Sequence, residues 1–96
     1  MKMITLDELK LLKIKNYKLD KNMEYETETI SFSKEDDEDN FITFTSTEVI
    51  SPEGEVSDLK GLTIEFTERC TPVKVVYFTS SATLESVQSY FNKLIL

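Results

Sequence analysis

The chain has 96 residues, a net charge of −7 and a hydrophobic fraction of 40%. A chain of this length can bury one core, and it has no room for a second domain or a large enclosed pocket. Six Phe and four Tyr residues argue against disorder. We therefore predict a single domain over residues 1–96.

Cysteine content and apolar runs indicate a compartment. Cys70 is the single cysteine, so no disulfide can form within the chain, which fits a reducing environment. No apolar run approaches the length of a transmembrane helix, and the N-terminus lacks the pattern of a signal peptide. We predict a cytoplasmic location, in a bacterium or in the host cell of a virus, and no membrane partner.

The negative charge is concentrated in the middle of the chain. Residues 22–68 contain fourteen acids and two lysines, whereas residues 1–21 carry a net +3 and residues 69–96 a net +2. A field of this sign repels nucleic acid and attracts basic surfaces. The charge pattern predicts a basic protein partner and no direct contact with nucleic acid.

The N-terminal segment has the signals of a short helix. Thr5 and Glu8 stand at the spacing of a capping box, and leucines recur on one face of the residues that follow. We predict a helix over residues 6–13 that docks on the core. Residues 14–19 alternate imperfectly between apolar and polar, which indicates a strand or an extended tail to the helix.

Two strands flank the acidic segment Lys34–Asn40. In the register that sets Ser33 opposite Phe41, apolar residues pair across the strands. These pairs are Phe32 with Ile42 and Ile30 with Phe44. The acidic segment lacks Gly and Pro, so we predict a solvated loop rather than a tight turn.

The residues before this hairpin change parity. Met23 and Tyr25 are apolar at odd positions, whereas the later apolar residues are at even positions. A β-bulge near Thr27–Thr29 would keep the apolar residues on the inside, and we favour it. A regular hairpin that runs past the edge of the sheet is the alternative.

The second half of the chain predicts two more strands. Ser51–Gly54 has the signature of a type I turn, and we expect residues 51–60 to form a polar connection. Leu62–Glu68 alternates cleanly, with its apolar residues inward and Thr or Glu outward. Val73–Thr79 is apolar on both parities, which is typical of a central strand or of one half-covered by a helix.

A C-terminal helix completes the predicted fold. Ala82–Ile95 has an apolar stripe at helical spacing, and Ser80 or Ser81 can cap it. The predicted fold class is therefore α+β. It is a mostly antiparallel sheet of four to five strands, with a short N-terminal helix and a C-terminal helix packed on one face.

The residue types argue against catalysis. The chain has no histidine, which removes the commonest general base and metal ligand, and Cys70 stands alone. The acids fail the spacing of an EF-hand, and two glycines are too few for a phosphate-binding loop. We predict a protein that is not an enzyme and that holds no metal and no cofactor.

The acidic residues can form an ordered array. Glu24, Glu26 and Glu28 would make a row with a spacing of about 6.7 Å on one strand face, with the acidic segment beyond it. One DNA strand carries a charge about every 3.4 Å. Other acids would have to fill in, among them Glu48, Glu65, Glu68 or those of residues 53–58. The alternative to such an array is that the acids form a solvated face that only keeps the protein soluble.

By size and charge alone, the chain resembles the small acidic inhibitors of phages and mobile elements, and toxin-immunity proteins. No sequence motif carries this likeness. Our first hypothesis is a non-catalytic inhibitor, in part a mimic of nucleic acid, that binds a nuclease or another nucleic-acid-binding enzyme. Tyr25 would be its apolar anchor. The predicted partner-binding residues are Glu24, Tyr25, Glu26, Glu28, Glu35, Asp36, Asp37, Glu38 and Asp39.

A second hypothesis uses the sheet edge instead of the charge. The protein would then be a structural or adaptor domain that pairs through the edge with a copy of itself or with a peptide strand. A homodimer is compatible with this hypothesis.

Overall fold

The computed structural model describes residues 4–20, 29–50, 53–54, 56–79 and 81–94. Its two helices and five strands follow one another in a simple order. They are α1 (Leu6–Leu9), β1 (Tyr17–Leu19), β2 (Thr29–Lys34), β3 (Asp37–Ile50), β4 (Val56–Glu68), β5 (Thr71–Phe78) and α2 (Leu84–Lys93).

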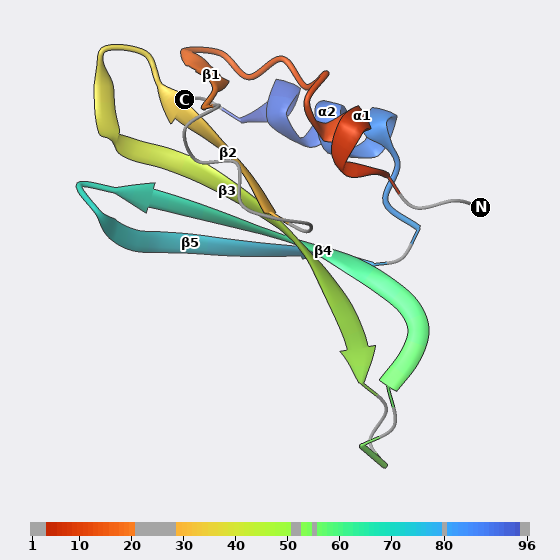
Figure 1. Cartoon of the computed structure of the whole chain (residues 1–96). Helices are drawn as coiled ribbons and strands as arrows, with labels where there is room; N and C mark the ends of the chain where they lie inside the picture. The colour runs from red at the N-terminus through yellow and green to blue at the C-terminus, as the bar shows by residue number, and fades with distance from the viewer. Residues whose placement is uncertain (1–3, 21–28, 51–52, 55, 80, 95–96) are drawn as a thin grey trace.

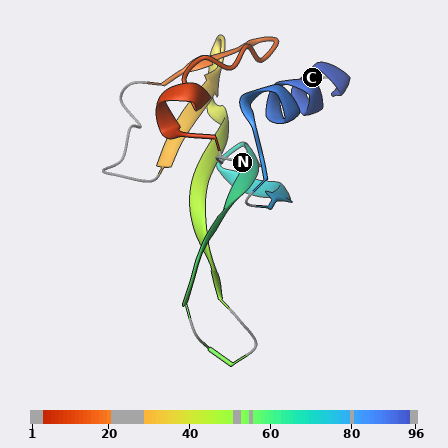
Figure 2. The ribbon, with the colours of Figure 1, turned by 90° about the vertical axis from the view of Figure 1, so that its right-hand side faces the viewer.

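The strands form one antiparallel sheet whose spatial order is the chain order, β1-β2-β3-β4-β5. Both helices lie on the same side of this sheet, and the end of the β3–β4 hairpin extends away from the body of the molecule (Figures 1 and 2). The predicted α+β class is confirmed. In the part of the chain that the structure describes, neither helix is long and apolar enough to cross a membrane.

The predicted hairpin register is confirmed. Ser33 lies opposite Phe41, and the expected apolar pairs follow it, Phe32 with Ile42 and Ile30 with Phe44. Apolar residues at even positions of β2, β3 and β4 therefore share the face that the helices cover. The bulge predicted near Thr27–Thr29, and the turn at 51–54 for the most part, lie outside the described residues.

The core lies between this sheet face and the helices. Phe91 of α2 packs its ring against Phe44 of β3 and Phe66 of β4, with centroids 5.7 and 6.0 Å apart. Val87, one turn earlier in α2, is fully buried. The helical stripe predicted from the sequence therefore packs on the sheet, as expected.

The opposite face of the sheet is lined with Ser and Thr. Ser31 and Thr43 pair across β2 and β3, and their hydroxyl oxygens lie 3.2 Å apart. Thr67 was expected to point outward, and it does lie on this face, but only 4% of it is exposed.

Both helices differ from the prediction at their ends. Thr5 and Glu8 form the predicted capping box, but α1 ends at Leu9 rather than near residue 13. After Leu9 the backbone changes to bonds between residues three apart, Leu11 with Glu8 and Leu12 with Leu9. The Lys13 backbone then bonds to the side chain of Gln88. The cap of α2 is Thr83, not Ser80 or Ser81, because the Thr83 oxygen accepts the N–H of Ser86.

The two strand predictions for the second half of the chain had different outcomes. Residues 51–60 were expected to be a connection, but β4 begins at Val56 and lengthens the β3–β4 hairpin. The last strand was expected to be central or half-covered. It is half-covered, with α2 on one side and residues such as Val75 exposed on the other, so the second alternative is confirmed. It is the edge strand β5, so the first alternative, a central strand, was wrong.

Candidate functional site

The acidic segment begins with a tight turn, which corrects the predicted solvated loop. Glu35 and Asp36 alone connect β2 to β3. Asp36 adopts a left-handed conformation with φ of 68°, which Asp tolerates better than most residues. The N–H of Glu35 donates to the carbonyl of Asn16 at 2.7 Å, so the turn is fixed to the segment before β1.

Beyond the turn, three residues of β3 loop out of the β2–β3 ladder. Lys34 pairs with Asp37, but the next pair joins Ser33 to Phe41, so residues 38–40 are extra on the β3 side. The Asp37 carboxylate accepts the N–H of Asp39 at 3.2 Å and the Nδ2 of Asn40 at 2.7 Å. The Asp37 side chain therefore holds two residues of the bulge, Asp39 and Asn40, by hydrogen bonds.

The bulge is also bonded to the β4–β5 turn. The N–H of Cys70 donates to the carbonyl of Asp39 at 3.0 Å, and the N–H of Arg69 donates to Oδ1 of Asn40 at 2.8 Å. Two turns far apart in the sequence therefore meet at one end of the sheet, on the left of Figure 1. These bonds hold the acidic backbone in one arrangement.

We call this region the acidic end and define it by six residues. They are Glu35, Asp36, Asp37, Glu38, Asp39 and Glu68, all exposed. Lys34 and Arg69 are the cations within the same two turns, which leaves a net charge of −4. The acidic end is therefore the densest negative surface among the residues whose side chains the structure describes.

The negative charge of the acidic end contributes to a raised pKa of the neighbouring Tyr17. Burial is the main cause that raises the pKa of the Tyr17 phenol, and the negative charges of Glu68 and Asp37 raise it further. Both carboxylates therefore act on one point, although they come from different strands.

Cys70 lies within the acidic end, and its thiol is not activated there. Its Sγ lies 3.7 Å from Oδ1 of Asp39. The negative charge of Asp39 is the main cause that raises the pKa of the Cys70 thiol. A raised pKa keeps the thiol protonated, which opposes a role as nucleophile.

The structure brings together only part of the predicted binding set. Glu35–Asp39 form one surface, whereas Glu24, Tyr25, Glu26 and Glu28 lie outside the described residues. The sequence prediction missed Asn40 and the Arg69–Cys70 turn as supports of this surface. Asn40 follows the acidic run directly, which is a weak signal. The turn carries no Gly or Asn, the usual residues for such a turn.

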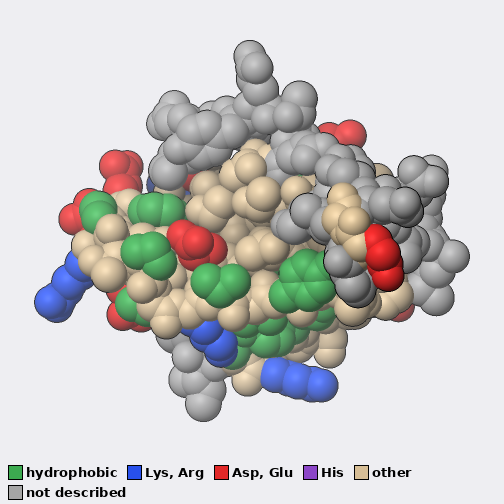
Figure 3. Space-filling view, turned by 90° about the horizontal axis from the view of Figure 1, so that it is seen from below, with side chains coloured by type: hydrophobic (Ala, Val, Ile, Leu, Met, Phe, Trp, Pro, Cys, Tyr) green, Lys and Arg blue, Asp and Glu red, His purple; other side chains and the backbone are tan. Residues whose placement is uncertain are grey.

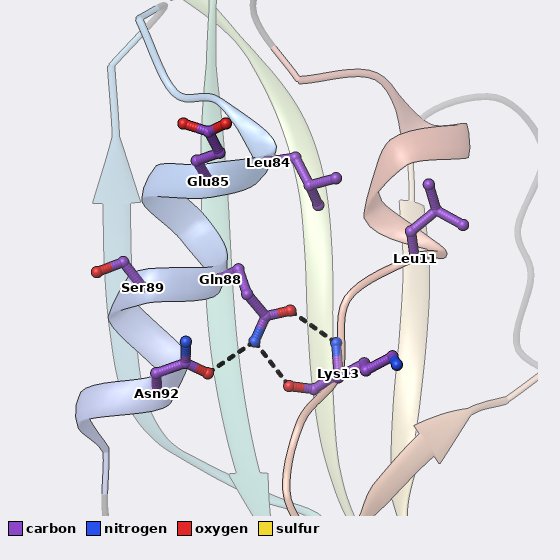
Figure 4. A pocket seen from close by; sticks show the side chains of 7 residues that line it. All are labelled: Leu11, Lys13, Leu84, Glu85, Gln88, Ser89 and Asn92. Carbon is purple, nitrogen blue, oxygen red and sulfur yellow. Dashed lines mark hydrogen bonds between the residues drawn. The ribbon is translucent and has the colours of Figure 1, made fainter.

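A groove lies on the other side of the molecule, between α2 and the segment after α1 (Figure 4). Its volume is about 610 Å³, and Leu11, Leu84 and Gln88 are among the residues that line it. Of its described lining residues, Glu85 alone carries a carboxylate. The hydrolysis of a glycosidic bond by a pair of carboxyl groups needs two such residues in one site.

The described carboxylates and the thiol do not form a metal site. No group of three or more His, Cys, Asp or Glu side chains in that part of the chain is arranged to hold a metal ion. The exposed carboxylates of the acidic end are thus spread over a surface and do not converge on one point.

Comparison of the chain with protein-family models, with curated proteins and with solved structures found no match.

Proposed function

We propose that the protein is a non-catalytic inhibitor that binds a basic, nucleic-acid-binding enzyme through the acidic end. The carboxylates would occupy the surface that otherwise contacts nucleic acid, and the enzyme would lose access to its substrate. A nuclease is one enzyme of this kind. Phage and mobile-element inhibitors and toxin-immunity proteins are settings in which such an activity is useful.

The observation that carries this proposal is the anchoring of the bulge. Asp39 and Asn40 are bonded to Cys70 and Arg69 on another hairpin. Binding through a flexible acidic loop would require ordering of that loop, which opposes association. A surface that is ordered before binding avoids this cost, so the bonds support a role in recognition rather than in solubility alone.

The charge of the acidic end would act mainly on the rate at which the partner associates. A net charge of −4 over two adjacent turns would steer a basic partner and raise the association rate. Exposed charge pairs contribute little to residence time. An apolar contact must therefore add to them, and Tyr25 remains our candidate for it.

The test compares two variants with the same total charge. The first is Glu35→Gln with Asp36→Asn and Glu38→Gln, which removes three charges from the acidic end and keeps Asp37 and Asp39. The matched control removes three exposed charges elsewhere. Its substitutions are Asp7→Asn, Glu53→Gln and Glu85→Gln.

Each immobilised protein is exposed to bacterial lysate and eluted in salt steps. We expect the unchanged protein and the control to capture a nucleic-acid-binding enzyme that elutes early, because salt screens the contact. The acidic-end variant should bind it about tenfold more weakly, since three exposed charge pairs at about 0.5 kcal/mol each give that factor. Equal capture by both variants, or capture of no such enzyme, would contradict the proposal.

A further inference from the structure

The edge strand β5 carries apolar side chains that are exposed to solvent. Val73, Val75 and Tyr77 are 54%, 59% and 50% exposed. Val75 and Tyr77 pair with Glu65 and Thr63 of β4, at positions that face away from the helices, and Figure 3 shows hydrophobic side chains among polar atoms on that face. Apolar groups at neighbouring positions of one strand form a patch, and such patches mark contact surfaces.

The backbone of β5 is open as well. It is the last strand of the sheet, and among the described residues its ladder partner is β4 alone. In an antiparallel ladder, every second residue turns its N–H and C=O away from the paired strand. The free edge of β5 is therefore a template for another strand.

The two edges of the sheet are protected unequally. The other edge strand, β1, has only three residues, and its Lys18 is exposed. β5 also has a lysine, but Lys74 Nζ lies 5.7 Å from the ring centroid of Phe66 and 5.8 Å from that of Tyr90. The Lys74 side chain is thus directed towards α2. Its charge does not lie at the open edge, where it would oppose pairing with another strand. Pro72 and the register shift beside it restrict only the start of the strand.

We propose that the protein self-associates through β5, with a second copy paired antiparallel across a two-fold axis at Val76. This register uses the regular residues 74–78. It sets Val75 of each copy opposite Tyr77 of the other, and pairs of β-branched with aromatic residues are favourable across strands. The result is one continuous ten-stranded sheet.

The Tyr77 ring is held on the surface of the sheet. Its ring lies against Gly61 of β4, where a Cβ atom would overlap the ring. The absence of a side chain at Gly61 thus lets the Tyr77 ring lie along the sheet surface.

Charge favours a second copy over a basic peptide as the occupant. Residues 71–78 include one cation, Lys74, and no acid, so the edge offers a basic peptide no carboxylate. Two copies of net charge −7 can meet here without opposing acids. Glu65, the neighbour of Val75 on β4, would lie three strand spacings across and two residues along from its counterpart, or about 16 Å away, which exceeds the Debye length of about 8 Å.

The expected dimer is weak. An edge contact of about five residues a side falls below the standard interface of about 1,600 Å², so we expect dissociation constants in the micromolar range or above. Salt should strengthen it, because screening reduces the repulsion between two acidic molecules. This dependence is opposite to that expected for a basic partner at the acidic end, so the two proposals can fail separately.

The test is sedimentation velocity of the full chain from about 5 to about 500 µM, in about 0.05 M and about 0.5 M NaCl. The dimer fraction should rise with both concentration and salt. Val75→Lys should abolish it, because a charged side chain on an edge strand opposes pairing. The matched control is Leu11→Lys, which changes another residue, 66% exposed, beside α1 and should leave dimerisation intact.

A second measurement needs no variant. Hydrogen exchange of amides in residues 74–78 should slow as the protein concentration rises, while exchange in β1 stays constant. A protein that is monomeric at every concentration and salt would overturn the proposal. Equal dimerisation of the Val75→Lys and Leu11→Lys variants would overturn it too.

Discussion

At the scale of single residues, the contact between Asp39 and Cys70 shows how the acidic end is built. Asp39 presents its carbonyl to the Cys70 N–H and its carboxylate to the Cys70 thiol. The first contact fixes the backbone, and the second keeps the thiol in its neutral form. The same residue thus orders the turn and suppresses its one reactive group.

This arrangement predicts the behaviour of Asp39→Asn. Removing the carboxylate removes the main cause that raises the pKa of Cys70, so the pKa falls and more thiolate is present at a given pH. Alkylation of Cys70 by iodoacetamide at about pH 8 should then be faster than in the unchanged protein. The control is Glu53→Gln, which removes one exposed charge elsewhere. Equal rates in all three proteins would show that Asp39 does not act on the thiol.

Sequence reasoning succeeds at this scale where one residue type admits few conformations. The Thr5–Glu8 capping box was predicted because a hydroxyl and a carboxylate three residues apart satisfy each other's backbone donors. The cap of α2 was missed because Ser86 takes the place that Glu or Gln usually has. The break between the strands 62–68 and 73–79 was predicted, but its narrowing to a two-residue turn was not. Arg69 and Cys70 adopt left-handed φ angles, 51° and 63°, that are rare outside Gly and Asn.

At the scale of elements, the side chain of Gln88 joins α2 to the N-terminal segment by hydrogen bonds. Oε1 of Gln88 accepts the N–H of Lys13 and its Nε2 donates to the Lys13 carbonyl, each at 2.8 Å (Figure 4). Nε2 also donates to Asn92 at 3.0 Å. The amide thus satisfies both backbone groups of a residue 75 positions away.

Gln88→Ala should therefore release this segment. Two hydrogen bonds to Lys13 are lost where water can replace them, so we expect the free energy of unfolding to fall by about 1 to 2 kcal/mol. Urea denaturation measures this loss, and hydrogen exchange of the Lys13 amide should speed up. Ser89→Ala, at the next and exposed position of α2, is the control and should change neither quantity. An unchanged exchange rate at Lys13 in Gln88→Ala would contradict this account.

The strands show why some elements could be predicted and others not. β2, residues 42–45 of β3 and the second half of β4 alternate, so their faces and the register of Ser33 with Phe41 followed from the sequence. β5 is apolar on both parities, and that pattern alone does not distinguish a covered strand from an edge strand with an open patch. Which strand ends the sheet depends on contacts between distant segments.

At the scale of the whole molecule, the two proposed contacts use different surfaces. The acidic end is formed by the β2–β3 and β4–β5 turns, whereas self-association would use the acid-free outer edge of β5. Pairing at that edge would leave the acidic end of each copy open, so a dimer would present two such surfaces. Linked binding surfaces raise the apparent affinity for a partner that can contact both.

The fold class and the acidic segment were therefore predictable from the sequence, and the support of the acidic end was not. Composition identified Glu35–Asp39 as an exposed run. The anchoring of this run depends on hydrogen bonds between residues about thirty positions apart, Asn40 with Arg69 and Asp39 with Cys70. No local pattern encodes such a pairing of two turns.

The central claim is that the acidic end takes the place of nucleic acid on an enzyme. Competition binding tests it most directly: a labelled oligonucleotide is bound to the captured enzyme, and its fluorescence anisotropy is followed as this protein is added. We predict displacement by the unchanged protein and by the Asp7, Glu53 and Glu85 control, and about tenfold weaker displacement by the Glu35, Asp36 and Glu38 variant. A stable complex that holds enzyme, oligonucleotide and this protein together would contradict the claim.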